Sequence, residues 1–521
     1  MSDELVEVQS DERTFARRIV TIVGGRGGVG KSTLAVSLSV YFAQLGKAVL
    51  LVDADLTGSN LHAQLGATAA SVEATLTDSD AEKFQDAIVS TSVPGLMLLP
   101  APHETPEAPT AFRASRKGKW LARIREQPFD LIVIVGGPGN GRFQVDLALA
   151  SDLSVLVATP DPPAIESAYR FVRALFLRRL ERALSEDRFR VPVYHRALSE
   201  LGVLPSPLDL VRKLEKLDRP LAELAWSEAQ RGHIGLVMNR VRLRADADLV
   251  ASMAVLASRH YGILLEELGH VEEEEAVMLS LRRGSPLLVE SPASKAGRSF
   301  ERISRRILAL VSARSERAPV PIPPERPTLY EGLGVVPSAT EEEIRRATKR
   351  RKDIYGEASI AAHSIVSAEG RKAELVRLGE AHDTLLDPVR RRAYDLSTFP
   401  DDPPPERGVR VSQRPPVAVL EQRLLEQELL REIGPDTEFR GEILRKMRES
   451  IGLDIEEISR VSKISKTYLH AIEDERYEAL PAEVYVRGFL VEFARMLGLE
   501  PTQVSKTYLQ RLKRRTGQLD R

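Results

Sequence analysis

The chain of 521 residues is long enough for several domains, and 43% hydrophobic with 29% charged residues is ordinary for a folded protein. Its formal net charge of −1 excludes a chain-wide attraction to nucleic acid or membrane. The sequence has no cysteine, which excludes disulfides, thiolate metal sites and a cysteine nucleophile. The acidic N-terminus lacks a signal-peptide core, and no apolar run approaches the ~20 residues of a membrane helix. We therefore expect a cytoplasmic protein without a membrane span.

Two proline-rich, charged stretches interrupt the chain and predict semi-rigid linkers, because proline favours extended backbone. They separate a large N-terminal part from two shorter parts. The predicted organisation is a first domain at 1–312, a linker at 313–327, a second domain at 328–398, a linker with an amphipathic helix (420–432) at 399–433, and a third domain at 434–521.

Short β-branched runs alternate with helical patterns in the N-terminal part. Continuous apolar runs between helices are typical of a buried parallel sheet. The predicted strands are Ile19–Val23, Val49–Val52, Leu96–Leu99, Leu131–Val135, Leu153–Ala158 and Ile234–Met238. A mixed-charge helical insertion is predicted at about 178–231. The other two parts show helical periodicity only, so the predicted fold class is an α/β parallel-sheet domain followed by two small all-α domains.

A glycine-rich loop, GGRGGVGKST, follows the first predicted strand and satisfies the P-loop pattern G-x-x-x-x-G-K-[ST]. Glycines let successive backbone N–H groups point at a phosphate, and the helix that follows places its positive end on the same anion. Lys31 can reach the outer phosphates, and the Ser32 hydroxyl can ligate Mg²⁺. We therefore predict a site for ATP and Mg²⁺. Its predicted binding residues are Gly25, Arg26, Gly27, Gly28, Val29, Gly30, Lys31, Ser32 and Thr33.

The run RGGVGKS resembles the deviant P-loop of the MinD/ParA family, in which K-G-G-x-G-K-[ST] is usual, and the resemblance extends over roughly residues 18–312. In that family the first lysine reaches across a dimer to the partner's nucleotide. Arg26 holds that position here, and arginine keeps the charge and can contact phosphate in a bidentate way. The resemblance implies a nucleotide-dependent homodimer in which Arg26 and Lys31 act on the phosphates.

Two further segments extend the resemblance. VDADLTGSNLHAQLG, residues 52–66, is similar to the second strand and switch region of the family, especially of the FlhG-like branch that regulates flagellar number and position. It implies that Asp53 lies near the metal together with Ser32, and that Asp55 orients the attacking water. VMNR, residues 237–240, resembles the segment whose asparagine, here Asn239, bonds to adenine.

One departure from the family concerns the metal. The family's strand of the IDTPPG type ends in an aspartate, whereas this chain has DLIVIVGGPGNG with Val135 at that position. A carboxylate there holds a Mg²⁺-bound water, and valine accepts no hydrogen bond. We expect weaker metal binding and slow hydrolysis, which leaves open whether the chain is an enzyme.

The middle part resembles a J-domain through LYEGLGV, the Thr340–Glu343 capping box and DPVRRRAYD. A working J-domain carries His-Pro-Asp after its second helix, but residues 356–358 here are Gly-Glu-Ala. The resemblance therefore implies a degenerate J-like domain kept for interaction. The basic run at 345–352 is either a solvated helix face or a docking face for an acidic partner.

The C-terminal part predicts a helix–turn–helix with its break at Lys463–Ser465. It resembles the helix–turn–helix of RodZ, a bacterial cell-shape protein, through EALPAEVYVRGFL at 478–490. In RodZ this module mainly binds the filament protein MreB. Residues 434–521 carry 16 Lys+Arg and 15 Asp+Glu, a net charge of +1. So low a charge favours protein binding over DNA binding, since phosphate neutralisation supplies most nonspecific DNA affinity.

Together these features predict a nucleotide-binding adaptor of the MinD/ParA type that positions or organises cell machinery, such as cytoskeletal or polar machinery. It would dimerise with ATP, hydrolyse it weakly or not at all, and bind protein partners through its two helical domains. Two alternatives stay open. One is a fully active positioning ATPase of the MinD or FlhG type, and the other is a DNA-associated regulator that acts through its helix–turn–helix.

Overall fold

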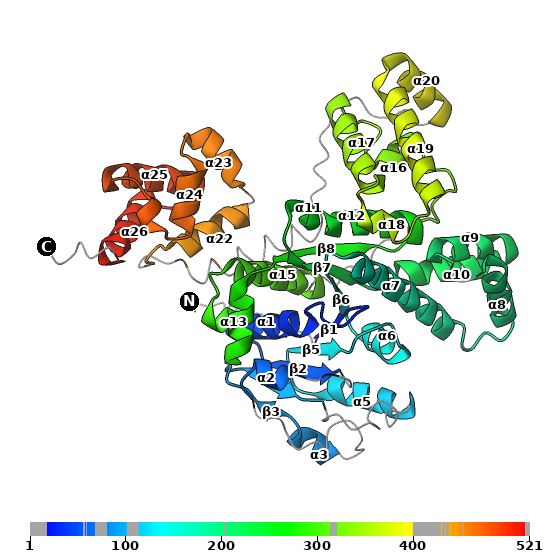
Figure 1. Ribbon diagram of the computed structural model, residues 1–521, viewed down its shortest axis with the longest axis horizontal. Coiled ribbons are helices and arrows are strands. Elements are labelled where there is room, and N and C mark those ends of the chain that lie inside the picture. The colour runs from blue at the N-terminus through cyan, green and yellow to red at the C-terminus, as the bar shows by residue number, and fades with distance from the viewer. Residues whose placement is uncertain are drawn as a thin grey trace, which may run out of the picture. The chain divides into compact units, whose positions relative to one another are not determined.

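The structure is a computed structural model that describes residues 18–55, 58, 60–67, 81–101, 114–202, 205–312, 320–399, 429, 433, 437–451 and 453–515. The chain divides into two compact units. The first contains residues 1–304 and 315–411, and the second contains residues 305–314 and 412–521. Each unit is described by itself (Figure 1).

An eight-stranded sheet forms the centre of the first unit, in the order β3-β4-β2-β5-β1-β6-β7-β8. Neighbouring strands are parallel except β3 and β4, which are antiparallel. The strands are β1 (Arg18–Val23), β2 (Val49–Ala54), β3 (Val89–Ser90), β4 (Leu96–Leu99), β5 (Leu131–Gly136), β6 (Leu153–Ala158), β7 (Ile234–Val241) and β8 (Leu265–Glu272). This confirms the six predicted strands and the α/β class. The two edge strands β3 and β8 were missed, because β3 has only two residues and β8 buries only three of its eight.

Helices pack around this sheet and position the loops at its edge. Helix α1 contacts β1, β2, β4 and β5. Side chains of α5 and α6 share one buried cluster with β1, β2 and β5, and α6, α7 and α12 contribute to a second. The helices are α1 (Lys31–Gln44), α2 (Leu61–Gln64), α3 (Ala81–Asp86), α5 (Ala114–Glu126), α6 (Arg142–Leu149), α7 (Pro162–Ala183), α8 (Arg190–Leu201), α9 (Pro207–Leu217), α10 (Arg219–Gln230), α11 (Arg244–Ala247), α12 (Leu249–Leu256), α13 (Glu275–Arg283), α14 (Leu287–Glu290) and α15 (Lys295–Ser312), whose residues from 305 onward belong to the second unit.

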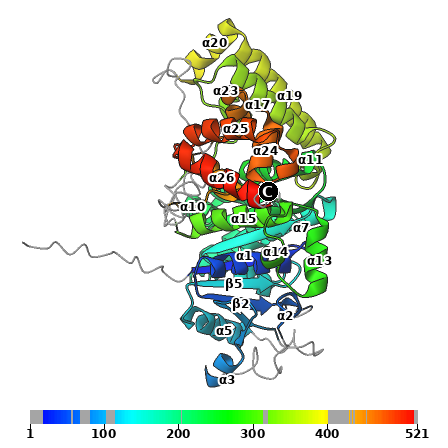
Figure 2. The ribbon, with the colours of Figure 1, turned by 90° about the vertical axis from the view of Figure 1, so that its left-hand side faces the viewer.

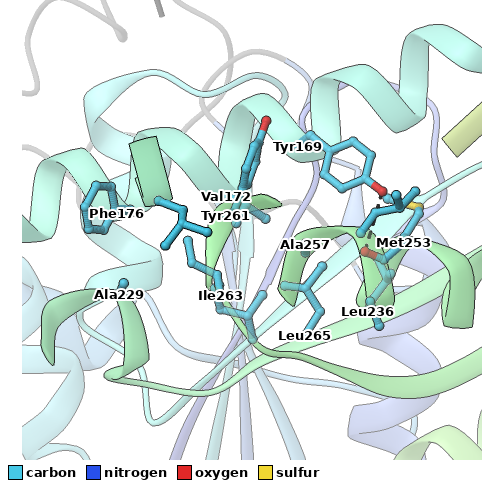
Figure 3. Close-up of a cluster of buried hydrophobic side chains, with 14 of the residues drawn as sticks. Tyr169, Val172, Phe176, Ala229, Leu236, Met253, Ala257, Tyr261, Ile263 and Leu265 are labelled. Carbon is cyan, nitrogen blue, oxygen red and sulfur yellow. Dashed lines mark hydrogen bonds between the residues drawn. The ribbon is translucent and has the colours of Figure 1, made fainter. Parts of the chain in front are cut away.

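The second buried cluster joins α7 to the end of α12. Tyr169 of α7 donates a hydrogen bond to the backbone oxygen of Met253 at 3.5 Å. Its ring meets Tyr261 edge-on, with 5.9 Å between ring centroids. Tyr261 belongs to a π-helical turn, Ala257–Tyr261, that continues α12. Figure 3 shows these side chains around Val172 of α7.

The helices α8, α9 and α10 occupy most of the predicted insertion at 178–231. Serine and aspartate caps begin two of them, because Ser206 accepts the N–H of Asp209 in α9 and Asp218 accepts the N–H of Leu221 in α10. Their apolar faces join the same cluster as α7. The insertion is therefore packed onto the sheet domain.

Five helices follow within the first unit: α16 (Leu329–Leu333), α17 (Glu341–Tyr355), α18 (Ile360–His363), α19 (Ala368–Leu386) and α20 (Pro388–Thr398). The predicted capping box is present at Thr340 and Glu343. Polar contacts, among them the following two, tie this helical block to the π-helical turn. Arg259 pairs with Glu374 at 2.9 Å, and His260 hydrogen-bonds to the Tyr355 hydroxyl at 2.9 Å. Helix α18 also contacts α7 and α12.

The second unit is helical and has a core of its own. Its helices are α22 (Gly441–Ile451), α23 (Ile455–Ser462), α24 (Lys466–Glu473), α25 (Glu483–Met496) and α26 (Pro501–Arg515), with a 3₁₀ turn at Tyr477–Ala479. The predicted break at Lys463–Ser465 is confirmed. Lys463 ends α23 in a left-handed conformation, and the Ser465 hydroxyl accepts the N–H of Thr467. The helix predicted at 420–432 falls outside the described residues, apart from residue 429.

Figure 2 gives a second view of the helices. Within the described ranges, no helix combines the length and the apolar character that crossing a bilayer requires.

Candidate functional site: a phosphate-binding loop and its surroundings

The loop between β1 and α1 has the backbone shape that its glycines allow. Gly28 and Gly30 adopt φ of 76° and 95°, in the left-handed region. A Cβ on Gly30 would lie 2.0 Å from the Asn239 Nδ2 atom, so only glycine also allows Asn239 to approach. Gly30 is the N-cap of α1 and offers no side-chain cap, and the first turn contains no acidic residue. The positive end of α1 is therefore left for an anion.

Lys31 is a buried cation with little neutralising charge around it. Only 6% of the residue is exposed, and its Nζ donates to the backbone oxygen of Arg26 at 3.3 Å. Burial lowers the pKa of Lys31, and the charge of Asp55 partly opposes that shift. An anion beside the ammonium would offset the cost of burying it. The location of Lys31 fits the phosphate contact predicted for it.

Arg26 is about half exposed and pairs within its own chain. Its Nη1 lies 3.1 Å from the Oδ1 of Asp161. Asp161 is the N-cap of α7, where it also accepts the N–H of Ala164 at 3.0 Å and the hydroxyl of Thr159 at 2.6 Å. Sequence reasoning missed Asp161 as a partner of Arg26. Its cap role has a local signal, because an aspartate followed by two prolines is typical of a helix start.

Asp53, Asp55 and Val135 lie at the ends of neighbouring strands. Asp53 on β2 pairs in register with Val135 on β5, and both side chains are buried. The Asp53 carboxylate accepts the backbone N–H of Asp55 at 3.1 Å and that of Leu61 at 3.4 Å. Asp53 therefore holds the segment that carries Asp55. The apolar character of Val135 next to it leaves this strand end with one carboxylate where the family pattern has two.

The residues around the loop suit Mg²⁺ bound together with a nucleotide. Magnesium takes one or two protein ligands and completes its shell with waters and substrate phosphates. The hydroxyls of Ser32 and Thr33 make no side-chain hydrogen bond to other described residues, which leaves both available at the start of α1. In the described part of the chain, no three His, Cys, Asp or Glu residues gather into a protein-only metal cage. Ser32 would be a direct ligand, and Asp53 would accept a hydrogen bond from a metal-bound water.

Asn239 lies against the loop, where its Nδ2 donates to the backbone oxygen of Val29 at 2.9 Å. Thus the structure brings Arg26, Lys31, Asp55 and Asn239, from three separate segments, to one loop.

Sequence reasoning also missed a second polar side chain near Asp55. A Cβ on Gly137 would lie 3.0 Å from the Asp55 Oδ1 and 3.1 Å from the Nε2 of Gln144. No pattern in the sequence points to Gln144.

Several cations of the second unit are arranged differently, because acidic side chains pair with them. Pairs are Lys466 with Glu456 at 2.5 Å, Arg511 with Glu475 at 2.9 Å, Lys513 with Glu483 at 3.0 Å and Arg514 with Glu438 at 3.3 Å. Lys466 begins α24, the second helix of the helix–turn–helix, and the other three cations are on α26. These pairings reduce the positive charge available to a DNA backbone.

Two family models match the chain. Residues 16–180 match the family described as NUBPL iron-transfer P-loop NTPase, and residues 443–504 match the family described as Helix-turn-helix domain.

Several characterised proteins are similar to the N-terminal part of the chain. The septum site-determining protein MinD of Synechocystis is 25% identical over 295 residues, which cover 56% of this chain and 89% of that protein. The antiactivator FleN of Pseudomonas aeruginosa is 23% identical over 292 residues, 56% of this chain and 86% of that protein. A solved structure of MinD from Pyrococcus horikoshii, complexed with Mg-ADP, is 20% identical and covers 57% of this chain and 100% of that one, with a TM-score of 0.36. The N-terminal part thus contains a P-loop NTPase domain that is similar to MinD and FleN, and the helical region that follows it includes a helix–turn–helix domain.

Proposed function

We propose that this protein is a cytoplasmic, nucleotide-binding adaptor of the MinD/ParA type that positions or organises cell machinery. The observation that carries the proposal is the N-terminus of α1, which has no side-chain cap and begins with buried Lys31 followed by Ser32 and Thr33. This set of groups suits the phosphates of ATP with Mg²⁺. The similarity to MinD and FleN supports a positioning role.

The proposal includes slow hydrolysis. Val135 occupies the strand end where a carboxylate would hold a Mg²⁺-bound water. Asp53, its neighbour in the sheet, already accepts two backbone N–H groups and is 2% exposed. Metal-assisted hydrolysis therefore has one fewer carboxylate to support it. A fully active ATPase is the alternative, and turnover of the wild-type chain with Mg²⁺ distinguishes the two.

The proposal also includes an ATP-dependent homodimer, in which Arg26 leaves Asp161 and contacts the partner's nucleotide. The ion pair between them is half exposed, so breaking it costs about 1 kcal/mol or less. Sedimentation velocity with a non-hydrolysable ATP analogue and Mg²⁺ measures the dimer. We expect Arg26→Ala to bind the nucleotide and stay monomeric, whereas the wild type dimerises. A wild-type chain that binds the analogue and remains a monomer would contradict this part of the proposal.

Protein partners would bind through the J-like block and the helix–turn–helix. The second unit exposes apolar side chains that its core does not use, with Val484 80% exposed and Tyr485 64% exposed. Nearby on the same helix, Phe489 stacks on Tyr468 with 5.5 Å between ring centroids. A fluorescent fusion imaged in its native cell tests the positioning role. We expect a focus or polar cap that Lys31→Ala disperses, and uniform fluorescence of the wild type would argue against it.

A second candidate is a DNA-associated regulator, which the helix–turn–helix match favours. The paired cations of α24 and α26 argue against it. Fluorescence anisotropy with random and genomic duplexes, repeated over a salt titration, decides between the two. We expect weak binding at low salt that vanishes near ~0.15 M. A sequence-selective complex with nanomolar affinity at that salt would promote the regulator.

A further inference from the structure

We propose that Gln144 positions the attacking water for the ATP hydrolysis that remains, sharing this task with Asp55. The inference rests on the proposed nucleotide site and extends it to a residue that neither the P-loop pattern nor the strand-end carboxylates include. Gln144 lies in the first turn of α6, three residues after the N-cap Gly141. It is partly buried, and no hydrogen bond links its amide to another described side chain or backbone group.

The geometry places the Gln144 amide and the Asp55 carboxylate over the same glycine. The site that a Cβ on Gly137 would occupy lies 3.0 Å from the Asp55 Oδ1 and 3.1 Å from the Gln144 Nε2. Both distances are shorter than ordinary van der Waals contact with a methyl group, so both polar groups lie close to Gly137. A Cβ at Gly141 would lie 3.1 Å from the other end of the same amide, its Oε1. The glycines of this loop therefore make room for the Gln144 side chain.

Gly137 lies on the phosphate side of the loop. The charge of Asp55 acts on Lys31, and the next residue of the β5 loop, Pro138, faces Gly27 of the P-loop across 3.8 Å from a Cβ built there. Gln144 thus lies on the side of the P-loop where a terminal phosphate would meet water. A carboxamide both donates and accepts, so one water can bond to Gln144 and Asp55 together.

In that arrangement the water oxygen forms a bond to the γ-phosphorus while the bond from phosphorus to the β–γ bridging oxygen breaks. The bond's electron pair leaves with ADP, and the proton that the water loses is released with phosphate. A neutral amide orients the water without replacing the metal-side carboxylate that Val135 lacks. Orientation without that carboxylate fits a slow rather than a rapid ATPase.

The test uses the full chain with three variants: Gln144→Ala, Gly137→Ala and Asn140→Ala. Asn140 is an exposed amide in the same loop and serves as the matched control. The first readout is ADP affinity, measured with a fluorescent analogue and Mg²⁺. The second is trapping of ADP with aluminium fluoride, which imitates the phosphoryl group with its in-line water. The third is turnover, separated into kcat and KM.

We expect Gln144→Ala and Gly137→Ala to keep ADP affinity within about twofold, to lose the trapped complex, and to lower kcat at least tenfold with KM unchanged. Asn140→Ala should behave like wild type. Gly137→Ala places a methyl group against the Gln144 amide and the Asp55 carboxylate, so it tests the proposal if Gln144→Ala does not fold. Wild-type trapping that both variants retain would overturn the inference. A wild-type chain that binds ADP but neither traps nor hydrolyses would also overturn it, whereas failure to bind any nucleotide would overturn the proposed function itself.

Discussion

The phosphate loop and the helix–turn–helix unit both contain buried or partly buried cations, but the two regions differ in how far a carboxylate neutralises the charge. Lys31 is buried beside a backbone oxygen, and its pKa is lowered because burial outweighs the charge of Asp55. Arg448 in α22 is also largely buried, yet two hydrogen bonds of 2.6 and 3.0 Å join it to Glu473. An incompletely neutralised buried charge marks a place for a ligand, while a matched one marks structure. The buried cation of the phosphate loop therefore suits an anionic ligand, whereas the buried cation of the helix–turn–helix unit already has its partner within the protein.

The largest effect on nucleotide binding should follow removal of the incompletely neutralised cation. Lys31→Ala should weaken ATP binding by roughly a hundredfold or more, because a charge-assisted contact in a partly dry site is lost. A fluorescent ATP analogue measures the affinity. Lys349→Ala, which removes an exposed lysine from α17, is the control and should bind normally. Equal binding by Lys31→Ala and wild type would remove the basis of the comparison.

Breaking the matched pair tests the other half of the comparison. Arg448→Ala leaves the Glu473 carboxylate buried and uncompensated, with 3% of its side chain exposed, which should cost about 3–5 kcal/mol of unfolding free energy. Lys466→Ala removes the exposed pair with Glu456 and should cost below about 1 kcal/mol. Urea denaturation of the second unit, followed by circular dichroism, measures both. Similar losses of unfolding free energy for the two variants would show that burial does not determine how much these ion pairs stabilise the protein.

His260 extends the comparison to a half-buried group that stays neutral. Burial lowers its pKa to about 4, although Glu374 nearby opposes the shift. The unfolded chain therefore binds the proton more readily than the folded one, and stability falls as pH drops from about 6.5 to about 4. At pH 5 the loss is on the order of 2 kcal/mol. His260→Gln should remove this part of the acid dependence in thermal melts at pH 7 and pH 5. An unchanged pH slope in that variant would assign the loss to other groups.

Restoring the missing carboxylate should have the smallest effect. Val135→Asp adds a hydrogen-bond acceptor beside Asp53 and should raise Mg²⁺-dependent turnover roughly tenfold. The buried carboxylate also risks destabilising the sheet, so the melting temperature is measured alongside turnover. Val135→Asn, which lacks the charge, is the matched control. Rapid ATP turnover by the wild type without partners would show that Val135 does not slow hydrolysis.

Local sequence predicted the core of the fold well, because the central strands are buried on both faces and appear as continuous apolar runs. It missed β8, whose alternating polar residues LEELGHVE reflect a sheet edge. The helix–turn–helix break was predictable, since Ser465 is a cap residue between two helical patterns. The P-loop was predictable because its function depends on backbone shape, and glycine spacing records that shape directly.

The sequence by itself determined the α/β class, the phosphate loop, the chemical identity of Val135 and the helix–turn–helix. Tertiary structure alone decided that Arg26 meets Asp161 and that Asn239 meets the Val29 carbonyl. It also placed Gln144 and Asp55 close to the same residue, Gly137. It further decided that the helical block of α16 to α20 contacts the π-helical turn through Glu374 and Tyr355. The physical reason is that helix and strand periodicity and loop backbone shape are encoded within a few residues. Contacts between strand ends depend instead on the order in which the sheet assembles its strands.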